Sequence, residues 1–230
     1  MDKEVNKARS LLKGTIAMMP LSLAVVPWGF LAGSFAIDSG LTPLEGQAMS
    51  AILFAGAAQL VAMGMIKAGA SVMTMVVTIF FITSRHFLYG LSMRSHISHL
   101  PMRWRVCLGF LLTDELFALC GHHKPNHFDP WYALGAGFSF YLIWNFATFV
   151  GIVVGAQIPD LQHYGLEFAI AATFIAIVVP NIKSWPVLLA ALSGLVSSVV
   201  LSYLGIESGL VIASLIGMSV GYFAEGWFKS

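Results

Sequence analysis

The stretch WYALGAGFSFYLIWNFATFVGIVVGA, at residues 131–156, contains no charged side chain. A helix rises about 1.5 Å per residue, and about 20 predominantly apolar residues are enough to cross the hydrocarbon core of a bilayer. This stretch is longer than that minimum. It therefore predicts a membrane-spanning helix.

The composition extends this pattern along the whole chain. Hydrophobic residues make up 58% and charged residues 10% of the 230 residues, and the mean hydropathy is +0.83. Soluble domains are roughly a quarter charged, and no soluble core could hide so much apolar surface. We therefore predict an all-α polytopic membrane protein with seven or eight hydrophobic helices, some of them broken, in a single transmembrane domain over residues 1–230. The eight apolar stretches are 14–37, 46–66, 69–91, 106–121, 131–156, 166–182, 185–204 and 208–224.

The first apolar stretch follows four basic residues, as the apolar part of a secretory signal peptide does. At ~24 residues it is longer than that part of a signal peptide, and no clear small-x-small cleavage site follows it. We expect it to remain in the protein as a spanning helix.

Orientation follows from Lys and Arg, because cytoplasmic loops hold the excess of these residues. Eight crossings with a cytoplasmic N-terminus place eight of them inside and three, all arginines of the loop 92–105, outside. If stretch 46–66 or 69–91 dips into the membrane and returns, that loop moves inside and the distribution becomes seven to four. The charge rule favours eight crossings only slightly.

A faint internal repeat relates the two halves of the chain, about 14–121 and 131–226. The motif WGFLAG at 28–33 leads to FAGAAQ at 54–59, and WNFATFVG at 144–151 leads to FIAIVVP at 174–180. Such a repeat would place the halves parallel with eight crossings and inverted with seven, and both arrangements occur in transporters.

Helix breaks are predicted at two places. Pro27 with nearby prolines and glycines interrupts the first stretch, and Gly56 lies in a small-residue patch before Gln59 in the second. Proline removes a backbone donor, and broken backbone survives in a membrane only where protein or water satisfies it. The alternative is that these residues only allow helices to pack closely.

Three charged residues lie inside apolar stretches, where an ionisable group costs roughly 2.5–3.5 kcal/mol to insert. They are Arg85, Asp114 and Glu115. Arg85, toward the end of stretch 69–91, offers a planar fork of donors that suits a carboxylate, and the adjacent His86 changes charge near neutral pH. The alternative for Arg85 is a helix that ends early and lets the side chain reach the interface.

Asp114 and Glu115 are about 100° apart on a helix, so at most one of them can point squarely at a given partner. One acid is expected to neutralise Arg85, and one to carry a proton, with Asp114 favoured as the carrier because its side chain is shorter. The alternative is an Arg–Asp pair that only ties two helices together.

Amides and histidines supply the other polar side chains. Gln59, Asn145 and Asn181 lie at or near membrane depth, where amides commonly form hydrogen bonds between helices. The histidines at 96, 99, 122, 123 and 127 fall in expected loops, without the Cys or carboxylate pattern of a metal site. We predict no metal and no cofactor.

Several classes of function lack their sequence signals. The chain has no P-loop, no Gly-x-Ser-x-Gly elbow and no His-Glu-x-x-His motif, so ATP hydrolysis and familiar hydrolytic chemistry are not supported. A net charge of +1 provides no basic surface for nucleic acid. We do not expect an enzyme.

Three ordered motifs resemble the AzlC family of bacterial branched-chain amino acid exporters. They are FAGAAQ at 54–59, RHFLYG at 85–90 and TDE at 113–115, and the resemblance extends from about residue 10 to 226. It implies a multi-pass protein of the bacterial inner membrane that exports branched-chain amino acids, L-valine prominently and in some members methionine. It also implies a small multi-span partner subunit of the AzlD type.

The residues and the resemblance agree on the chemistry of such a substrate. A zwitterionic aliphatic amino acid needs a cation for its carboxylate, an acid for its ammonium group and an apolar pocket. Without a nucleotide motif, we expect an ion gradient, most simply of protons, to drive export. The expected substrate-binding residues are Arg85, Gln59, Asn145, Phe54 and Phe87, and the expected proton-coupling residues are Asp114, Glu115 and His86.

Two other classes stay open at this point. A channel or scaffold whose Arg–acid cluster only holds helices together would show no substrate-dependent flux. A membrane enzyme that used His86 with the acids would need a nucleophile or metal that the sequence does not reveal.

Overall fold

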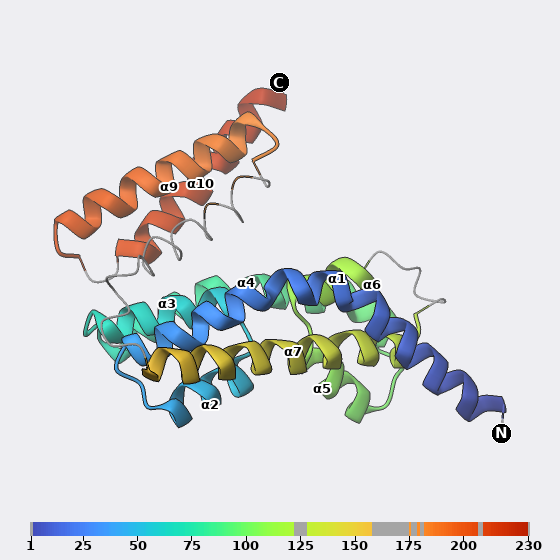
Figure 1. The fold of residues 1–230 in the computed structure, drawn as a ribbon. Coiled ribbons are helices and arrows are strands. Elements are labelled where there is room, and N and C mark those ends of the chain that lie inside the picture. Colours follow the sequence, from blue (N-terminus) through green and yellow to red (C-terminus); the bar gives the residue numbers. More distant parts are fainter. Residues whose placement is uncertain are drawn as a thin grey trace. The chain divides into compact units, whose positions relative to one another are not determined.

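The computed structural model describes residues 2–121, 128–157, 182–206 and 209–229, together with Ile175 and Val179. In these residues it contains helices and no strand (Figure 1). The helices are α1 (Asp2–Asp38), α2 (Pro43–Leu53), α3 (Gly56–Lys67), α4 (Val72–Ile97), α5 (Met102–Phe110), α6 (Asp114–Cys120), α7 (Pro130–Gln157), α9 (Trp185–Tyr203) and α10 (Gly209–Lys229).

Five helices in the described part of the chain are long and apolar enough to span a membrane. They are α1, α4, α7, α9 and α10. The predicted all-α membrane fold is therefore confirmed for the described residues. The predicted stretch 166–182 lies outside them apart from isolated positions, as do Asn181 and the histidines at 122, 123 and 127.

The chain divides into two compact units. The first comprises Met1–Met63 with Ile82–Leu161, and the second Gly64–Phe81 with Gln162–Ser230. In the second unit α9 and α10 pack antiparallel, because Ala190 lies beside Gly217 and Leu201 beside Gly209. No residue of α9 is buried, as expected for a helix that contacts lipid.

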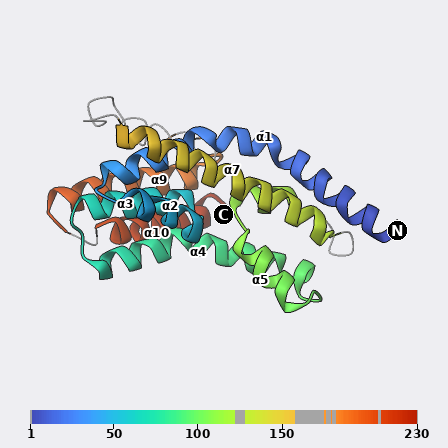
Figure 2. The same ribbon diagram turned by 60° about the horizontal axis from the view of Figure 1, so that its bottom comes forward.

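Helices α1 and α7 form the centre of the first unit and run parallel, side by side in both ribbon views (Figures 1 and 2). The Thr15 hydroxyl donates to the Gly135 carbonyl at 3.1 Å, and the Ser34 hydroxyl donates to the Gly151 carbonyl at 3.1 Å. Small residues let the two backbones come this close, as in other membrane helix pairs.

The expected break near Pro27 is wrong. Helix α1 continues without interruption through Pro20 and Pro27. Each proline removes a single backbone donor. Close packing along α7 holds the helix straight enough to continue past both positions.

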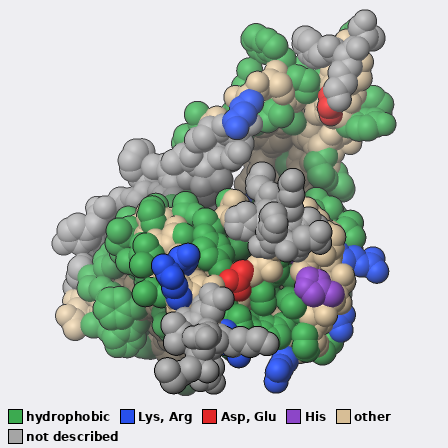
Figure 3. Space-filling view, turned by 90° about the vertical axis from the view of Figure 1, so that its right-hand side faces the viewer, with side chains coloured by type: hydrophobic (Ala, Val, Ile, Leu, Met, Phe, Trp, Pro, Cys, Tyr) green, Lys and Arg blue, Asp and Glu red, His purple; other side chains and the backbone are tan. Residues whose placement is uncertain are grey.

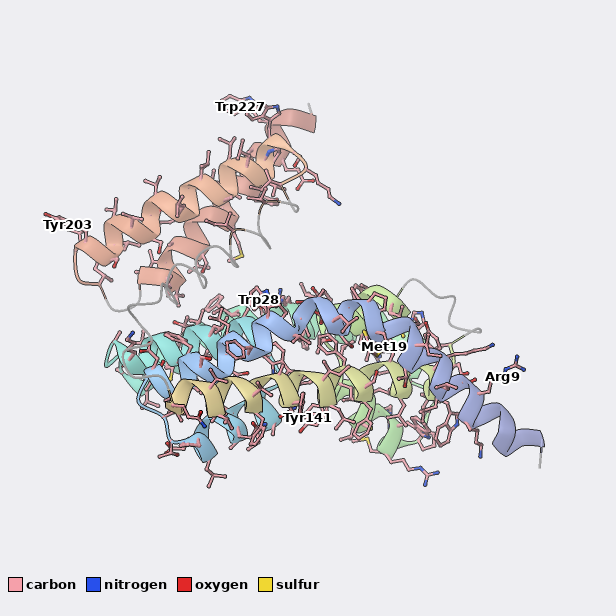
Figure 4. All side chains as sticks on the ribbon, in the orientation of Figure 1. Arg9, Met19, Trp28, Tyr141, Tyr203 and Trp227 are labelled. Atoms are coloured by element: carbon pink, nitrogen blue, oxygen red, sulfur yellow. The ribbon has the colours of Figure 1, made fainter. Side chains whose placement is uncertain are left out.

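The sequence left open whether 46–66 crosses the membrane or dips in and returns, and the structure has two helices there and not one spanning helix. Helix α2 ends at Leu53 and α3 begins at Gly56, where the sequence predicted a break. The Gln59 amide nitrogen donates to the Ser50 hydroxyl at 2.8 Å, a contact that one straight helix would not allow. The two helices therefore form a hairpin. Its tip at Phe54 lies against Tyr141, midway along α7 (Figure 4).

The stretch 106–121 is likewise a hairpin and not a spanning helix. Helix α5 ends at Phe110 and α6 begins at Asp114. Trp104 near the start of α5 packs on Trp131 at the start of α7, with ring centroids 4.9 Å apart, and Phe110 reaches Tyr141, at 5.6 Å. This hairpin thus enters from the end of the unit where α7 begins and turns back halfway along it.

The two hairpins enter from opposite ends. Helix α2 follows the end of α1, whereas α5 begins beside the start of α7. Because the first hairpin returns to its own side, the loop 92–105 lies at the same end as the N-terminal part of α1. Lys7 there lies 5.6 Å from the centre of the Trp131 ring.

Basic side chains consequently gather at one end of the first unit. Figure 3 faces this end and shows Lys and Arg side chains, in blue, among hydrophobic ones. The three arginines of the loop 92–105 now share a side with the basic N-terminal part of α1. For the loop 92–105 this agrees with the alternative in which 46–66 dips and returns; which end is cytoplasmic stays a prediction of the charge rule. The internal repeat stays a prediction, since much of its second half falls outside the described residues.

We expect Gly33→Ala to lower the amount of folded protein several-fold. A Cβ at Gly33 would lie 2.0 Å from the Thr148 carbonyl oxygen, so α1 and α7 would have to separate. Overpacking of this kind costs about 1–3 kcal/mol. Fluorescence-detected size-exclusion chromatography of detergent extracts after a heat ramp measures the loss.

Gly109→Ala is the matched control, because a Cβ at Gly109 meets no atom within 4 Å. Equal heat resistance of the two variants would contradict the close packing of α1 on α7.

Candidate functional site

Arg85 lies at the middle of α4, a helix of 26 residues. The helix continues to Ile97, so the alternative of an early helix end is wrong. A guanidinium at the centre of a spanning helix cannot easily reach the interface and needs a polar partner.

That partner is Asp114, the first residue of α6. The Arg85 Nη2 atom lies 2.9 Å from Asp114 Oδ2. Thr113 caps this short helix by accepting a hydrogen bond from the Leu116 backbone nitrogen at 3.4 Å. The turn between α5 and α6 thus fixes Asp114 at the tip of its hairpin, opposite Arg85. Of the two acids, Asp114 makes the contact expected of a partner for Arg85.

Two polar atoms of the ion pair have no hydrogen-bond partner among the described residues. Arg85 Nε and Asp114 Oδ1 are both buried and have no hydrogen-bond partner there. The two side chains as a whole keep 39% of their surface exposed. Charge-assisted hydrogen bonds are strong, so one open donor beside one open acceptor suits a ligand that carries both charges.

Tyr89 lies one turn after Arg85 on α4. Its ring stacks on Phe117 of α6, with centroids 4.4 Å apart and planes at 13°. The Tyr89 hydroxyl lies close enough to Asp114 to interact with it. Sequence reasoning missed both aromatic residues, although helical spacing places Tyr89 at i+4 from Arg85 and Phe117 at i+3 from Asp114.

Phe54 ends α2 with left-handed backbone, at φ 42° and ψ 44°. This conformation costs a residue other than glycine roughly 1–2 kcal/mol. It turns the Phe54 ring into an aromatic group with Phe110 at 5.9 Å, Tyr141 at 5.0 Å and Phe140 at 6.1 Å between centroids. The tips of the two opposed hairpins therefore meet through Phe54 and Phe110.

The site residues described above lie within residues 20–158, which match the AzlC protein family. The match covers more than half of the chain. This chain belongs to the AzlC family. It is a multi-pass membrane protein.

Individual relatives agree with this assignment. The inner membrane protein YgaZ of Escherichia coli (strain K12) is 30% identical over 222 residues, which cover 91% of this chain and 90% of YgaZ. An uncharacterized membrane protein of Archaeoglobus fulgidus is 28% identical and covers 93% of this chain and 94% of its own. One of Helicobacter pylori (strain ATCC 700392 / 26695) is 29% identical, with 82% and 83% covered. No solved structure matches this chain.

Gln59 of this AzlC-family chain is fully buried in a hydrogen-bonded network. The Ser50 hydroxyl contacts both the Gln59 amide and the Thr148 hydroxyl, the latter at 2.9 Å, and Thr148 donates to the Trp144 carbonyl at 3.0 Å. This network ties α2, α3 and α7 together beside the first hairpin tip. The described contacts of Gln59 are hydrogen bonds between helices, which is the alternative to a role in substrate binding.

Asn145 also lies apart from the ion pair. Its side-chain oxygen accepts from Gln47 at 3.0 Å, and its nitrogen donates to the Tyr141 carbonyl at 3.0 Å. Asn145 thus fixes α2 on α7.

Phe87 is 75% exposed. It is two residues from Arg85, which corresponds to about 200° around a helix. The structure therefore does not bring Phe87 to the ion pair.

His86 and Glu115 flank the ion pair. The His86 ring meets the edge of Tyr89 at 5.9 Å, and its Nδ1 lies 3.2 Å from the Thr83 carbonyl oxygen. Glu115 interacts with Thr113, the cap of α6. Among the described residues no three His, Cys, Asp or Glu side chains gather as a metal site would require.

Proposed function

We propose that this AzlC-family chain is a secondary transporter that exports branched-chain amino acids, L-valine first and methionine also, across the bacterial inner membrane. The observation that carries the proposal is the Arg85–Asp114 pair at the middle of a spanning helix and at the tip of a half-spanning hairpin. Discontinuous helices that meet at membrane depth are the usual place for a substrate site in secondary transporters. The relative YgaZ is an inner membrane protein, which supports the location.

The open atoms of the ion pair suit a zwitterion. Arg85 would take the carboxylate of the substrate, and Asp114 or Glu115 its ammonium group. Phe54 and its aromatic neighbours would face the aliphatic side chain. The amides of Gln59 and Asn145 would then hold the first hairpin in place.

Proton coupling follows from the same geometry. Where Glu115 takes the substrate ammonium, a substrate carboxylate that binds Arg85 would displace Asp114 from its cation, and a carboxylate without a cation in an apolar site binds a proton more readily. Proton uptake and substrate binding would thus depend on each other. A small AzlD-type subunit, a separate polypeptide, would complete the exporter.

The competing function is a channel subunit or scaffold whose Arg–acid cluster is structural. The satisfied network of Ser50, Gln59 and Thr148 is what such a protein would also use to hold helices together. The unsatisfied atoms of Arg85 and Asp114 favour the transporter, because a purely structural pair would be expected to use them.

Deleting the gene for this chain is expected to raise intracellular valine in cells fed valine-containing dipeptides. Peptidases release valine inside the cell, and export of the released residue is lost. Intracellular amino acids measured by mass spectrometry, with leucine, isoleucine and methionine dipeptides beside valine, rank the substrates.

Restoring the wild-type gene is the control, with any partner gene left intact. Unchanged valine efflux in the deletion strain would refute the transport assignment and favour the scaffold. Unchanged flux together with accumulation of a modified metabolite would point to a membrane enzyme.

A further inference from the structure

The tips of the two hairpins meet at the middle of the first unit. Each of them covers about half the length of α7, from opposite ends. Where their tips meet, the Phe54 ring stacks on the Phe110 ring, with 5.9 Å between centroids and 28° between planes. A path along the hairpins from one end of the unit to the other would meet these two rings.

The two rings differ in how firmly they are held. Phe54 is 6% exposed and lies against Phe140 and Tyr141 of α7. Phe110 is 47% exposed and ends a helix of only nine residues. Phe110 also contacts the Tyr141 ring, at 5.6 Å between centroids, but about half of it is exposed. Moving Phe110 away from Phe54 therefore disturbs less packing than moving Phe54 would.

Phe110 is also linked in sequence to the ion pair. It lies four positions before Asp114, across the turn of the second hairpin, and Asp114 contacts Arg85 at 2.9 Å. A change at the ion pair, such as the arrival of a substrate carboxylate, acts on the same turn that carries Phe110.

We propose that the contact between Phe54 and Phe110 is the barrier of the transport path, with Phe54 as the fixed half and Phe110 as the movable half. This inference rests on the proposed transport function. An apolar constriction of this kind excludes water and ions while it is closed. It also limits substrate size, because the side chain that passes must fit the space left by one displaced ring.

The left-handed backbone of Phe54 is consistent with such a role. Glycine adopts φ 42° without strain, whereas a phenylalanine there places its ring at the tip at the expense of local stability. The same feature supplies a test, because Phe54→Gly removes the ring and relieves the backbone at once. It also leaves a cavity in the packed core, so efflux is taken per amount of folded protein.

The test places each variant in the chromosomal copy of the gene, so that any partner subunit is made normally. Cells are preloaded with radiolabelled valine or phenylalanine, and efflux is followed per amount of the protein in the membrane. We expect Phe54→Gly and Phe110→Ala to raise phenylalanine efflux at least fivefold, and to let valine re-enter down its gradient. Phe146→Ala, at an exposed ring on α7, should behave as wild type.

Valine efflux by the wild-type protein distinguishes failure of the transport function from failure of the proposed barrier. No wild-type valine efflux refutes the transport function itself. Only the barrier is refuted if wild-type efflux is normal and Phe54→Gly and Phe110→Ala match wild type in phenylalanine efflux and in valine re-entry.

A crosslink provides a second measurement, which replaces both rings by cysteines and compares the same double variant with its two sulfurs joined and released. In a background of Cys107→Ser and Cys120→Ser, the Phe54→Cys and Phe110→Cys changes are joined by a short methanethiosulfonate crosslinker that reducing agent cleaves. We expect crosslinking to stop valine efflux and reduction to restore it, whereas either single cysteine should be unaffected by the reagent. Failure to crosslink, or unchanged efflux after crosslinking, overturns the proposal.

Discussion

Arg85→Lys is expected to lower valine efflux by an order of magnitude or more, although the positive charge is kept. A lysine can still pair with Asp114, but it lacks the Nε–H donor that Arg85 leaves open beside that pair. A point-charge ammonium cannot present two parallel donors to a substrate carboxylate as the planar fork of a guanidinium does. Losing one hydrogen bond to a charged group costs about 1.5–3 kcal/mol. Efflux from preloaded cells measures the change.

Arg94→Lys is the matched control, since Arg94 is exposed near the end of the same helix. Membrane levels of both variants are measured by immunoblot. Full efflux with Arg85→Lys at equal protein level would mean that Arg85 does not bind the substrate, and would favour the structural alternative for the ion pair.

Asp114→Asn is expected to uncouple transport from the proton gradient. The amide oxygen still accepts a hydrogen bond from Arg85, so the protein should remain in the membrane. It cannot take up a proton when the substrate displaces it. In proteoliposomes, exchange of valine for valine should persist, while valine flux driven by a pH gradient should fall at least tenfold.

Glu115→Gln is the comparison on the same helix. Glu115 points about 100° away from Asp114 and interacts with the cap residue Thr113, so this variant should keep pH-driven flux and mainly lower the amount of folded protein. If both Asp114→Asn and Glu115→Gln keep normal pH-driven flux, the acid pair does not couple transport, and His86 becomes the next candidate.

Hydropathy identified the apolar stretches but not the direction of the chain within them. Residues 46–66 and 106–121 are apolar enough to resemble spanning helices, and only Gly56 with its small neighbours indicated a break. The turn at 111–113 gave a weaker signal, because Leu111 and Leu112 suit a helix, although Thr113 followed by two acids is a helix-start pattern. The prolines had the opposite effect on the prediction: they suggested a helix break, but α1, packed on α7, continues through Pro27.

The candidate site was easier to predict than its surroundings. A charge in the middle of an apolar stretch demands a partner, and this argument led to Arg85 and Asp114 without a structure. Aromatic residues are common along the whole chain, so nothing distinguished Phe54 and Phe110 as a contacting pair or singled out Tyr89. Their roles depend on which tips meet, and that depends on the two reversals of chain direction.

The first hairpin also has a consequence for how the protein is made. The Ser50 hydroxyl, which also accepts from Gln59, donates to the Thr148 hydroxyl, a partner 98 residues after Ser50. A ribosome needs on the order of ten seconds to synthesise that interval. Until then the nascent hairpin carries polar groups and two helix ends that lipid cannot satisfy. We therefore expect the first hairpin to reach its final place in the membrane only after α7 has emerged.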